Sequence, residues 1–429
     1  MKKYHAIAAE LIVENRKLLA AQLAPNSVAI FNSNDEWPRS ADGFHLFRQN
    51  ADLFYLSGID QEQTTLLLFP DHPDENLREV LFIRDTNEHI AVWEGHKYTI
   101  EEAQAQSGIK TIFWASQLDA HLPSFMYVAQ NCYLNTNEHL RMRTPIADKD
   151  LRFAQQLCQQ YPLHNFKRLA PIMHHLRSIK TDAELACMRE AINITRSAFL
   201  RVLKFVKPGV TEYEIEAEIM HEYLKNRATG PAYSSIIASG GNSCVLHYVA
   251  NNQVCKDGDI LLMDFGAEYA NYAADLTRTI PVNGRFTARQ RAVYEAVLRV
   301  MEQAKSMLVP GNYLSDYEKD VGKIMESELI GLGLLSKDEV AKQNPDRPLY
   351  KKYYMHGTSH FLGLDVHDVG HKYNPIQAGM VFTCEPGIYI REEGIGIRLE
   401  NDILVTDHGP VDMMQFVPLH PDEIEDLMN

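Results

Sequence analysis

The first third of the chain alternates short apolar runs with amphipathic stretches. A helical pattern opens the chain in MKKYHAIAAELIVENRKLL, and a second covers Ile100 to Gln106. Between and after them, apolar runs predict strands at 27–31, 53–59, 64–69, 79–85, 111–116 and 132–135. Strands interleaved with helices indicate an α/β layer. Trp93, Glu94 and Gly95 predict an exposed turn, with Trp93 as a packing or loop aromatic.

Longer helical periods follow a break near residues 165–178. The stretch that begins NFKRLAP is basic, contains a proline and has no regular period. Three N-terminal capping signals then predict helix starts, because each places Glu or Gln three residues after a threonine. They are Thr181–Glu184, Thr211–Glu214 and Thr287–Gln290.

Strand-rich segments lie beside these helices at 235–282 and 379–406. Long helices beside such strands predict an α+β domain, with an antiparallel sheet inside and helices outside. A chain of 429 residues also exceeds what one hydrophobic core usually holds. We therefore expect two domains, an α/β domain over 1–172 and an α+β domain over 173–429.

Composition narrows the classes of function. The net charge of −15 argues against a nucleic-acid surface, which needs a basic field. The six cysteines are widely spaced without a C-x-x-C pair, so reduced thiols in a cytosol are expected. Charges scattered through the N-terminal helix argue against a signal peptide, and no run approaches a membrane span. We expect a cytoplasmic protein that binds neither nucleic acid nor membrane.

Four carboxylates stand in or beside strand-like, apolar sequence of the second domain. Asp264 ends DILLMD, Asp275 precedes LTRTIPV, Glu385 ends MVFTCE, and Glu400 lies within IGIRLENDILV. Such carboxylates are costly to bury unless a cation or a partner neutralises them. Each one alone is more often a solvated or salt-bridged side chain. The four together, with the histidine-rich loop at 355–370, predict a site for two divalent metal ions.

The histidine-rich loop does not have the pattern of a mononuclear zinc helix. His356 and His360 have the spacing of H-E-x-x-H, but the sequence is H-G-T-S-H, and Gly357 weakens a helix. We therefore reject the zinc-helix interpretation. An oxygen-rich set with one imidazole suits manganese, cobalt or zinc. Cys384, which alternates away from Glu385, is interpreted as a small buried hydrophobe and not as a nucleophile.

Together these segments resemble the pita-bread metallopeptidases, which include methionine aminopeptidase, prolidase and aminopeptidase P, with creatinase as a fold relative. The resemblance covers residues 175–425 through NSCVLHY, MDFGAEYANYAADLTRT, MHGTSHFLGLDVHDVG, EPGIYI and GIGIRLEND. Earlier, RQNADLFYLSGI and VWEG resemble the amino-terminal domain of aminopeptidase P and prolidase less specifically. The resemblance implies a domain of that kind over 1–172 and a pita-bread catalytic domain over 173–429.

The resemblance also assigns roles to residues. It implies five ligands for two divalent ions, with the second and the last bridging both ions: Asp264, Asp275, His360, Glu385 and Glu400. It implies that a group of side chains lines the substrate cleft or supports catalysis: His247, His356, His367, Tyr389 and Arg398. Glu385 is also expected to carry a proton to the leaving nitrogen. Alternation places Arg398 on one strand face with Glu400 and Asp402, so we expect it to orient that ligand.

The implied activity is removal of the first residue from peptides whose second residue is proline, because M-H-G-T-S-H resembles aminopeptidase P more than prolidase. Two divalent ions would match the charge of four carboxylates and lower the pKa of an attacking water. Manganese is the expected metal, with cobalt and zinc as alternatives. Small peptides with an Xaa-Pro N-terminus are the expected substrates, and a homo-oligomer, either a dimer or a tetramer, is the expected assembly.

Two alternatives stay open at this point. A prolidase, restricted to dipeptides, needs a group that holds the proline carboxylate. After the H-D-V-G run this chain offers His371 and Lys372, where bacterial aminopeptidase P relatives usually carry an arginine. A non-catalytic pita-bread binding module would be indicated by lost ligands, whereas all five are present. Creatinase-like chemistry is disfavoured for the same reason.

Overall fold

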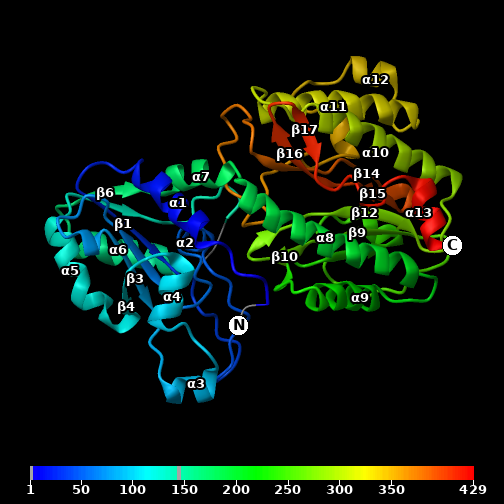
Figure 1. Cartoon of the computed structure of the whole chain (residues 1–429). Helices are drawn as coiled ribbons and strands as arrows, with labels where there is room; N and C mark the ends of the chain where they lie inside the picture. Colours follow the sequence, from blue (N-terminus) through cyan, green and yellow to red (C-terminus); the bar gives the residue numbers. More distant parts are fainter. Residues whose placement is uncertain (1–2, 143–145) are drawn as a thin grey trace. The chain divides into compact units, whose positions relative to one another are not determined.

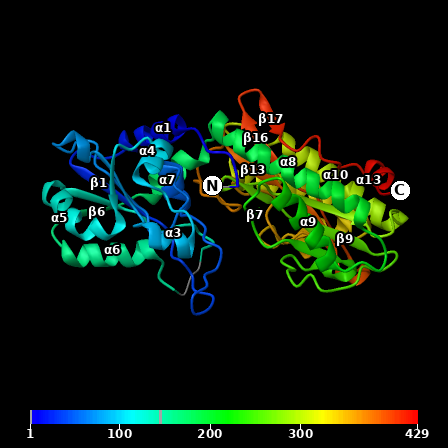
Figure 2. The same ribbon diagram turned by 60° about the horizontal axis from the view of Figure 1, so that its bottom comes forward.

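The computed structural model describes residues 3–142 and 146–429, which form two compact units. One unit extends to Arg177 and the other runs from Ser178 to Asn429. Each has its own sheets and its own helices (Figures 1 and 2). Among the described residues, none of the helices combines the length and the apolar character needed to cross a membrane.

The first unit is an α/β layer around a mixed sheet with the strand order β4-β3-β2-β1-β5-β6. β1 pairs antiparallel with β2 and parallel with β5. The strands are β1 (Ser27–Asn32), β2 (Thr65–Leu68), β3 (Glu79–Ile83), β4 (Thr111–Trp114), β5 (Asn131–Leu134) and β6 (Asn165–Arg168). The helices are α1 (Ala9–Ala20), α2 (Ala51–Ser57), α3 (Glu88–Glu94), α4 (Ile100–Ser107), α5 (Leu118–Val128), α6 (Lys149–Gln160) and α7 (Ala170–Ser178).

Both faces of this sheet are covered. On one face, Val28 and Ile30 of β1 pack with Phe125 of α5 and Leu157 of α6. Phe31 points to the opposite face by alternation and is equally buried, because α2 lies against β1 and β2 there. Burial on both faces explains why these strands appear in the sequence as continuous apolar runs.

Two local predictions for this unit were wrong. The apolar run at 53–59 forms α2 instead of a strand, and the Asn50 side chain caps it by accepting from the N–H groups of Asp52 and Leu53. Residues 53–57 are all buried, so the helix shows no polar face. Trp93 belongs to the end of helix α3 and not to a loop turn, although it is exposed as expected, at 77%. The stretch at 165–178, where a break was expected, contains the division between the two units after Arg177 and forms β6 and α7.

The second unit consists of small antiparallel sheets enclosed by long helices, as the α+β prediction requires. Its sheets have the orders β11-β10-β7, β12-β9-β8, β13-β16-β17 and β14-β15. The strands are β7 (Gly230–Pro231), β8 (Ile236–Ser239), β9 (Ile260–Asp264), β10 (Ala267–Tyr269), β11 (Tyr272–Ala273), β12 (Thr277–Pro281), β13 (Val381–Cys384), β14 (Gly387–Ile390), β15 (Ile395–Arg398), β16 (Asn401–Thr406) and β17 (Gly409–Asp412). The helices are α8 (Asp182–Phe205), α9 (Glu212–Lys225), α10 (Ala288–Ser306), α11 (Leu314–Gly331), α12 (Lys337–Ala341) and α13 (Pro421–Met428).

The predicted capping boxes are confirmed, and they fix where α8, α9 and α10 begin. In α8, the Thr181 side chain accepts from the N–H of Glu184, whose carboxylate accepts from the N–H of Thr181 in return. The boxes at Thr211–Glu214 and Thr287–Gln290 open α9 and α10. Figures 1 and 2 both show α9 alongside α8, which in turn packs against β10.

Candidate active site

Most candidate ligands lie at or next to the ends of paired strands, and the pairing brings them close together. Asp264 ends β9 and is paired with Thr277, which begins β12 two residues after Asp275. Cys384 at the end of β13 pairs with Asn401 at the start of β16. The next residue outward on each strand is a candidate ligand, Glu385 on one and Glu400 on the other.

The strand predicted through Arg398, Glu400 and Asp402 is broken. β15 ends at Arg398 and β16 begins at Asn401, and the two belong to different sheets. Glu400 therefore lies in an irregular link, where its N–H donates to the carbonyl of Thr277 at 3.1 Å. At this link the chain passes from one sheet to another. Glu400 is still held in place, because Thr277 of β12 provides the acceptor for its N–H that a neighbouring strand would otherwise provide.

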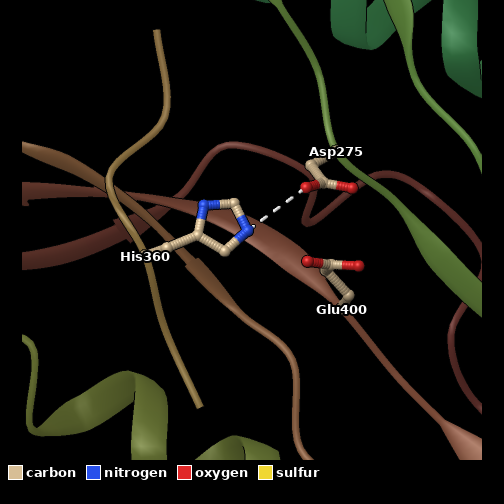
Figure 3. Close-up of side chains that lie close together, drawn as sticks. All are labelled: Asp275, His360 and Glu400. Atoms are coloured by element: carbon tan, nitrogen blue, oxygen red, sulfur yellow. Dashed lines mark ion pairs between the residues drawn. The ribbon is translucent and has the colours of Figure 1, made fainter. Parts of the chain in front are cut away.

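Three candidate ligands from separate segments point toward one another (Figure 3). One donor atom from each of Asp275, His360 and Glu400 can be chosen so that all lie within 4.8 Å. The His360 Nε2 atom is 3.5 Å from Asp275 Oδ2 and 3.6 Å from Glu385 Oε1. Asp264 lies beside this group, because the Tyr233 hydroxyl donates to both Asp264 and Asp275.

The imidazole of His360 is oriented for coordination through Nε2. Its Nδ1 lies 2.9 Å from the carbonyl oxygen of Phe361, which requires an N–H at Nδ1. The lone pair of a neutral ring is then on Nε2, the atom that faces the carboxylates. A backbone carbonyl that fixes the tautomer in this way is typical of metal-binding histidines.

The carboxylates are crowded and poorly neutralised. Burial and repulsion from Asp275 and Glu385 raise the pKa of Glu400 well above its usual range. Burial raises the pKa of Glu385 to about 7, although His360 and Arg398 oppose the shift. Burial also raises the pKa of Asp264 against the opposing charge of Arg398.

This crowding is a test of whether a metal fits. Four carboxylates and one imidazole nitrogen are a donor set for hard or borderline divalent cations. The single hydroxyl proton of Tyr233 can serve only one of its two carboxylate partners at a time. Positive charge between the carboxylates would reduce their repulsion and would neutralise the carboxylate that receives no proton from Tyr233. The residues therefore fit a pair of divalent ions.

Beside the carboxylates, His356, Tyr389 and Arg398 form a hydrogen-bonded chain. The Tyr389 hydroxyl is 2.8 Å from His356 Nε2 and accepts from Arg398 at 2.9 Å. Burial and the nearby charge of Arg398 lower the pKa of His356 to about 3, so its ring is neutral. Burial raises the pKa of Tyr389 to about 12, which keeps its proton in place.

Arg398 binds a different carboxylate from the one expected. Its guanidinium donates to Asp264 Oδ2 at 2.6 Å and to Thr277 Oγ1 at 3.1 Å. Thr277 Oγ1 in turn donates to Glu400 Oε2 at 2.6 Å. Arg398 therefore reaches Glu400 only through Thr277, because the break after β15 turns its side chain toward β9.

The other two predicted histidines are more exposed. His367 stacks edge-on against His360, with ring centroids 4.3 Å apart. His247 is exposed in the loop after β8 and lies close enough to His356 to help lower the pKa of that histidine. Cys384 is fully buried, as expected, and burial raises the pKa of its thiol far above the usual range. An un-ionised thiol is a poor nucleophile.

Sequence reasoning missed Tyr233 and Thr277, which contact the candidate ligands directly. Tyr233 lies between β7 and β8, in a segment without a regular pattern. Nothing in its sequence surroundings marks it. Thr277 stands in the run DLTRT beside Asp275, so its proximity was readable from the chain. Its bond to Glu400 depends on the pairing of distant strands.

Comparison with known proteins assigns the chain to a family. Residues 186–407 match metallopeptidase family M24, and residues 12–133 match the N-terminal domain of aminopeptidase P. The chain belongs to metallopeptidase family M24. Its second unit accordingly has the pita-bread fold, and its first unit is the mixed α/β domain that accompanies it.

Individual relatives match almost the whole chain. The Xaa-Pro aminopeptidase of Escherichia coli (strain K12) is 35% identical over 433 residues, covering 96% of this chain and 96% of that protein. Aminopeptidase PepP of Pseudomonas aeruginosa superposes with a TM-score of 0.89 at 33% identity, covering 99% of this chain and 98% of the other. Zinc-substituted E. coli aminopeptidase P in complex with product gives a TM-score of 0.87 at 34% identity, with 99% of each chain covered.

Proposed function

We propose that this M24 metallopeptidase is an Xaa-Pro aminopeptidase, which removes the first residue from peptides with proline at position two. The observation that carries this function is the convergence of candidate ligands from three segments, with donor atoms of Asp275, His360 and Glu400 within 4.8 Å. It occurs in a chain that matches an Xaa-Pro aminopeptidase over nearly its full length. Peptides with an Xaa-Pro N-terminus are the substrates under this proposal.

The metal site of the proposal comprises Asp264, Asp275, His360, Glu385 and Glu400. These residues would hold two divalent ions. We favour manganese, with cobalt and zinc as alternatives, because carboxylate and imidazole donors suit all three. When bound, such ions lower the pKa of water toward neutrality and polarise the scissile carbonyl.

Other side chains bind and orient the substrate in this proposal. His247, His356 and His367 line the path of the peptide, and His356 keeps its neutral ring in place through Tyr389. Glu385, whose Oε2 is 3.8 Å from His356 Nδ1, carries a proton to the leaving nitrogen. The nitrogen of a cleaved amide must gain a proton to leave as an amine, and the proline nitrogen, which has no N–H in the peptide, leaves as a secondary amine. Arg398 fixes Asp264.

The proposal includes the setting of the enzyme. It takes residues 1–172 as the amino-terminal domain and residues 173–429 as the catalytic domain, a boundary that lies within α7 (Ala170–Ser178). We further propose that the chain works in the cytoplasm as a homo-oligomer, either a dimer or a tetramer. Analytical ultracentrifugation of the purified protein measures the number of chains in this assembly.

The test incubates manganese-loaded enzyme with three matched peptides: Ala-Pro, Ala-Pro-Ala and acetyl-Ala-Pro-Ala. Ala-Pro-Ala should yield free alanine and Pro-Ala, because an aminopeptidase does not require a carboxylate on the proline. Acetyl-Ala-Pro-Ala should stay intact, because its amine is blocked. Products are identified by mass, and chelator-treated enzyme is the control.

Two outcomes would contradict the proposal. Hydrolysis confined to the dipeptide Ala-Pro would make the enzyme a prolidase. Cleavage of the acetylated peptide would show that the free amine is not recognised.

A further inference from the structure

A glutamate that is not one of the proposed metal ligands binds the loop between His356 and His360. Glu318 lies on α11 and is half-buried. Its Oε1 accepts from the N–H groups of Thr358 at 2.8 Å and Ser359 at 3.3 Å. Its Oε2 accepts from the Thr358 hydroxyl at 3.1 Å. All three donors lie between His356 and His360.

This loop needs such a partner. Residues 355–360 form neither helix nor strand, so their buried N–H groups need hydrogen-bond partners from other segments. Thr358 is fully buried, where water cannot replace a lost acceptor. The N–H of His360 donates to Thr383 Oγ1 of β13 at 3.2 Å. Glu318 therefore holds Thr358 and Ser359, and β13 holds His360.

The residue before Glu318 contacts the same loop. Tyr317 is fully buried, and its hydroxyl is 2.9 Å from Ser359 Oγ and 3.8 Å from Cys384 Sγ. Cys384 immediately precedes the candidate ligand Glu385. Helix α11 thus contacts both the histidine loop and the end of β13 through two consecutive side chains, and this fixes the two segments relative to each other.

We propose that Glu318 is a positioning residue for the metal site and for His356. This proposal rests on the function proposed above. Glu318 touches neither reacting atoms nor candidate ligands, so it acts through the loop backbone. By holding Thr358 and Ser359 it sets the direction in which the imidazole of His360 faces the carboxylates. It also sets the distance between His356 and Tyr389.

The test uses variants that separate reach from charge. Glu318→Gln keeps an oxygen at the same reach for both N–H groups, and its amide can donate to the Thr358 hydroxyl. Glu318→Asp keeps the charge but withdraws the oxygens by one methylene. Glu318→Ala removes both. Asp320→Ala, on the same helix and in an exposed pair with Lys323, is the matched control.

The primary readout is manganese affinity, measured by titration calorimetry on folded protein well below its unfolding temperature. Outer partners of metal ligands typically change affinity or activity by about ten- to a hundredfold when removed. We expect a loss of that size for Glu318→Ala and for Glu318→Asp. Glu318→Gln and Asp320→Ala should keep wild-type affinity. The turnover number on Ala-Pro-Ala should follow the same order.

The outcomes are decisive in either direction. Wild-type manganese affinity in both Glu318→Ala and Glu318→Asp would overturn the positioning role and leave Glu318 a stabilising residue only. Equal loss in Glu318→Gln and Glu318→Ala would overturn the hydrogen-bond explanation. If Glu318→Ala does not fold, the comparison of Gln with Asp still decides. If the wild-type enzyme binds manganese but cleaves no Xaa-Pro peptide, the proposed function fails while this titration remains interpretable.

Discussion

Arg398 makes contacts that a lysine cannot reproduce. Its guanidinium donates to Asp264, Thr277 and Tyr389, at distances from 2.6 to 3.1 Å. A single ammonium lacks the planar fork that reaches three partners at fixed directions. We predict that Arg398→Ala lowers kcat/KM by about ten- to a hundredfold at saturating manganese, with Arg398→Lys between it and wild type.

Circular dichroism should show that both Arg398 variants keep their fold. Arg299→Ala is the matched control, because Arg299 pairs with Glu328 on the exposed side of α10. Unchanged kinetics in Arg398→Ala would contradict its role at Asp264.

Asp150 in the first unit has an unusual environment for a carboxylate. It is buried and accepts from the side chains of Asn32, Asn50 and Asn135. Burial raises its pKa to about 7, although the bond from Asn32 opposes the shift. The unfolded value is about 3.9, so between these limits the folded state binds more protons than the unfolded state.

This linkage fixes the direction of a pH effect. We predict that the first unit loses stability as pH rises from about 4 to about 7, by up to about 4 kcal/mol, and changes little above that. Asp150→Asn should flatten the dependence. Trp37, Trp93 and Trp114 all lie in the first unit, so tryptophan fluorescence during urea unfolding at several pH values measures it. Asp119→Asn, at an exposed position, should retain the wild-type slope.

At the scale of elements, a buried ion pair joins the start of α8 to the loop after His360. Lys180 Nζ lies 3.2 Å from Asp368 Oδ2, and both side chains are 1% exposed. Gly363 is required beside them, because a Cβ there would lie 2.2 Å from Asp368 Oδ2. The pair therefore fixes the histidine-rich loop to the helical layer.

Removing one partner of this pair takes away a buried ion-pair contact of the other charge, which stays buried. We predict that Asp368→Ala lowers the free energy of unfolding of the second unit by about 3–5 kcal/mol. The double variant Lys180→Met/Asp368→Leu should lose less, because neither charge of the pair remains to be buried. Urea unfolding followed by far-UV circular dichroism measures both, and Asp316→Ala, from an exposed pair with Lys319, is the control. Equal losses in the single and double variants would contradict the explanation.

The elements show why some features were predictable from sequence and others were not. Runs buried on both faces, such as 27–31 and 64–69, were assigned as strands because continuous apolar sequence is typical of covered sheets. The run at 53–59 has the same composition but forms a helix, since burial on all sides leaves no polar positions to reveal the period. Capping boxes were found because they depend only on residues three positions apart.

The candidate site divides in the same way. Its carboxylates and His360 were recognised as candidates because charged groups in apolar strands stand out in a sequence. Tyr233, Thr277 and Glu318 were not, because their partners are brought to them only by tertiary structure. Arg398 was assigned to Glu400 by alternation, and that inference failed where the strand breaks at Leu399 and Glu400.

For the whole molecule, the two units predict a separation of metal binding from part of the stability. All proposed ligands lie in the unit from Ser178 to Asn429, whereas the first unit has its own sheet and core. A ligand that binds only the folded state stabilises it by about 2.7 kcal/mol at a hundredfold excess over Kd. That stabilisation belongs to the unit that contains the ligands.

We therefore predict that a chelator lowers one thermal transition and leaves another in place. Circular dichroism should show the second unit melting at lower temperature without manganese, while tryptophan fluorescence, which reports the first unit, should show an unchanged midpoint. In Asp275→Asn, which removes a proposed ligand, the melting temperature of the second unit should be the same with and without manganese. An equal shift of the fluorescence transition would mean that the units unfold as one cooperative body, and metal binding would then stabilise the whole chain.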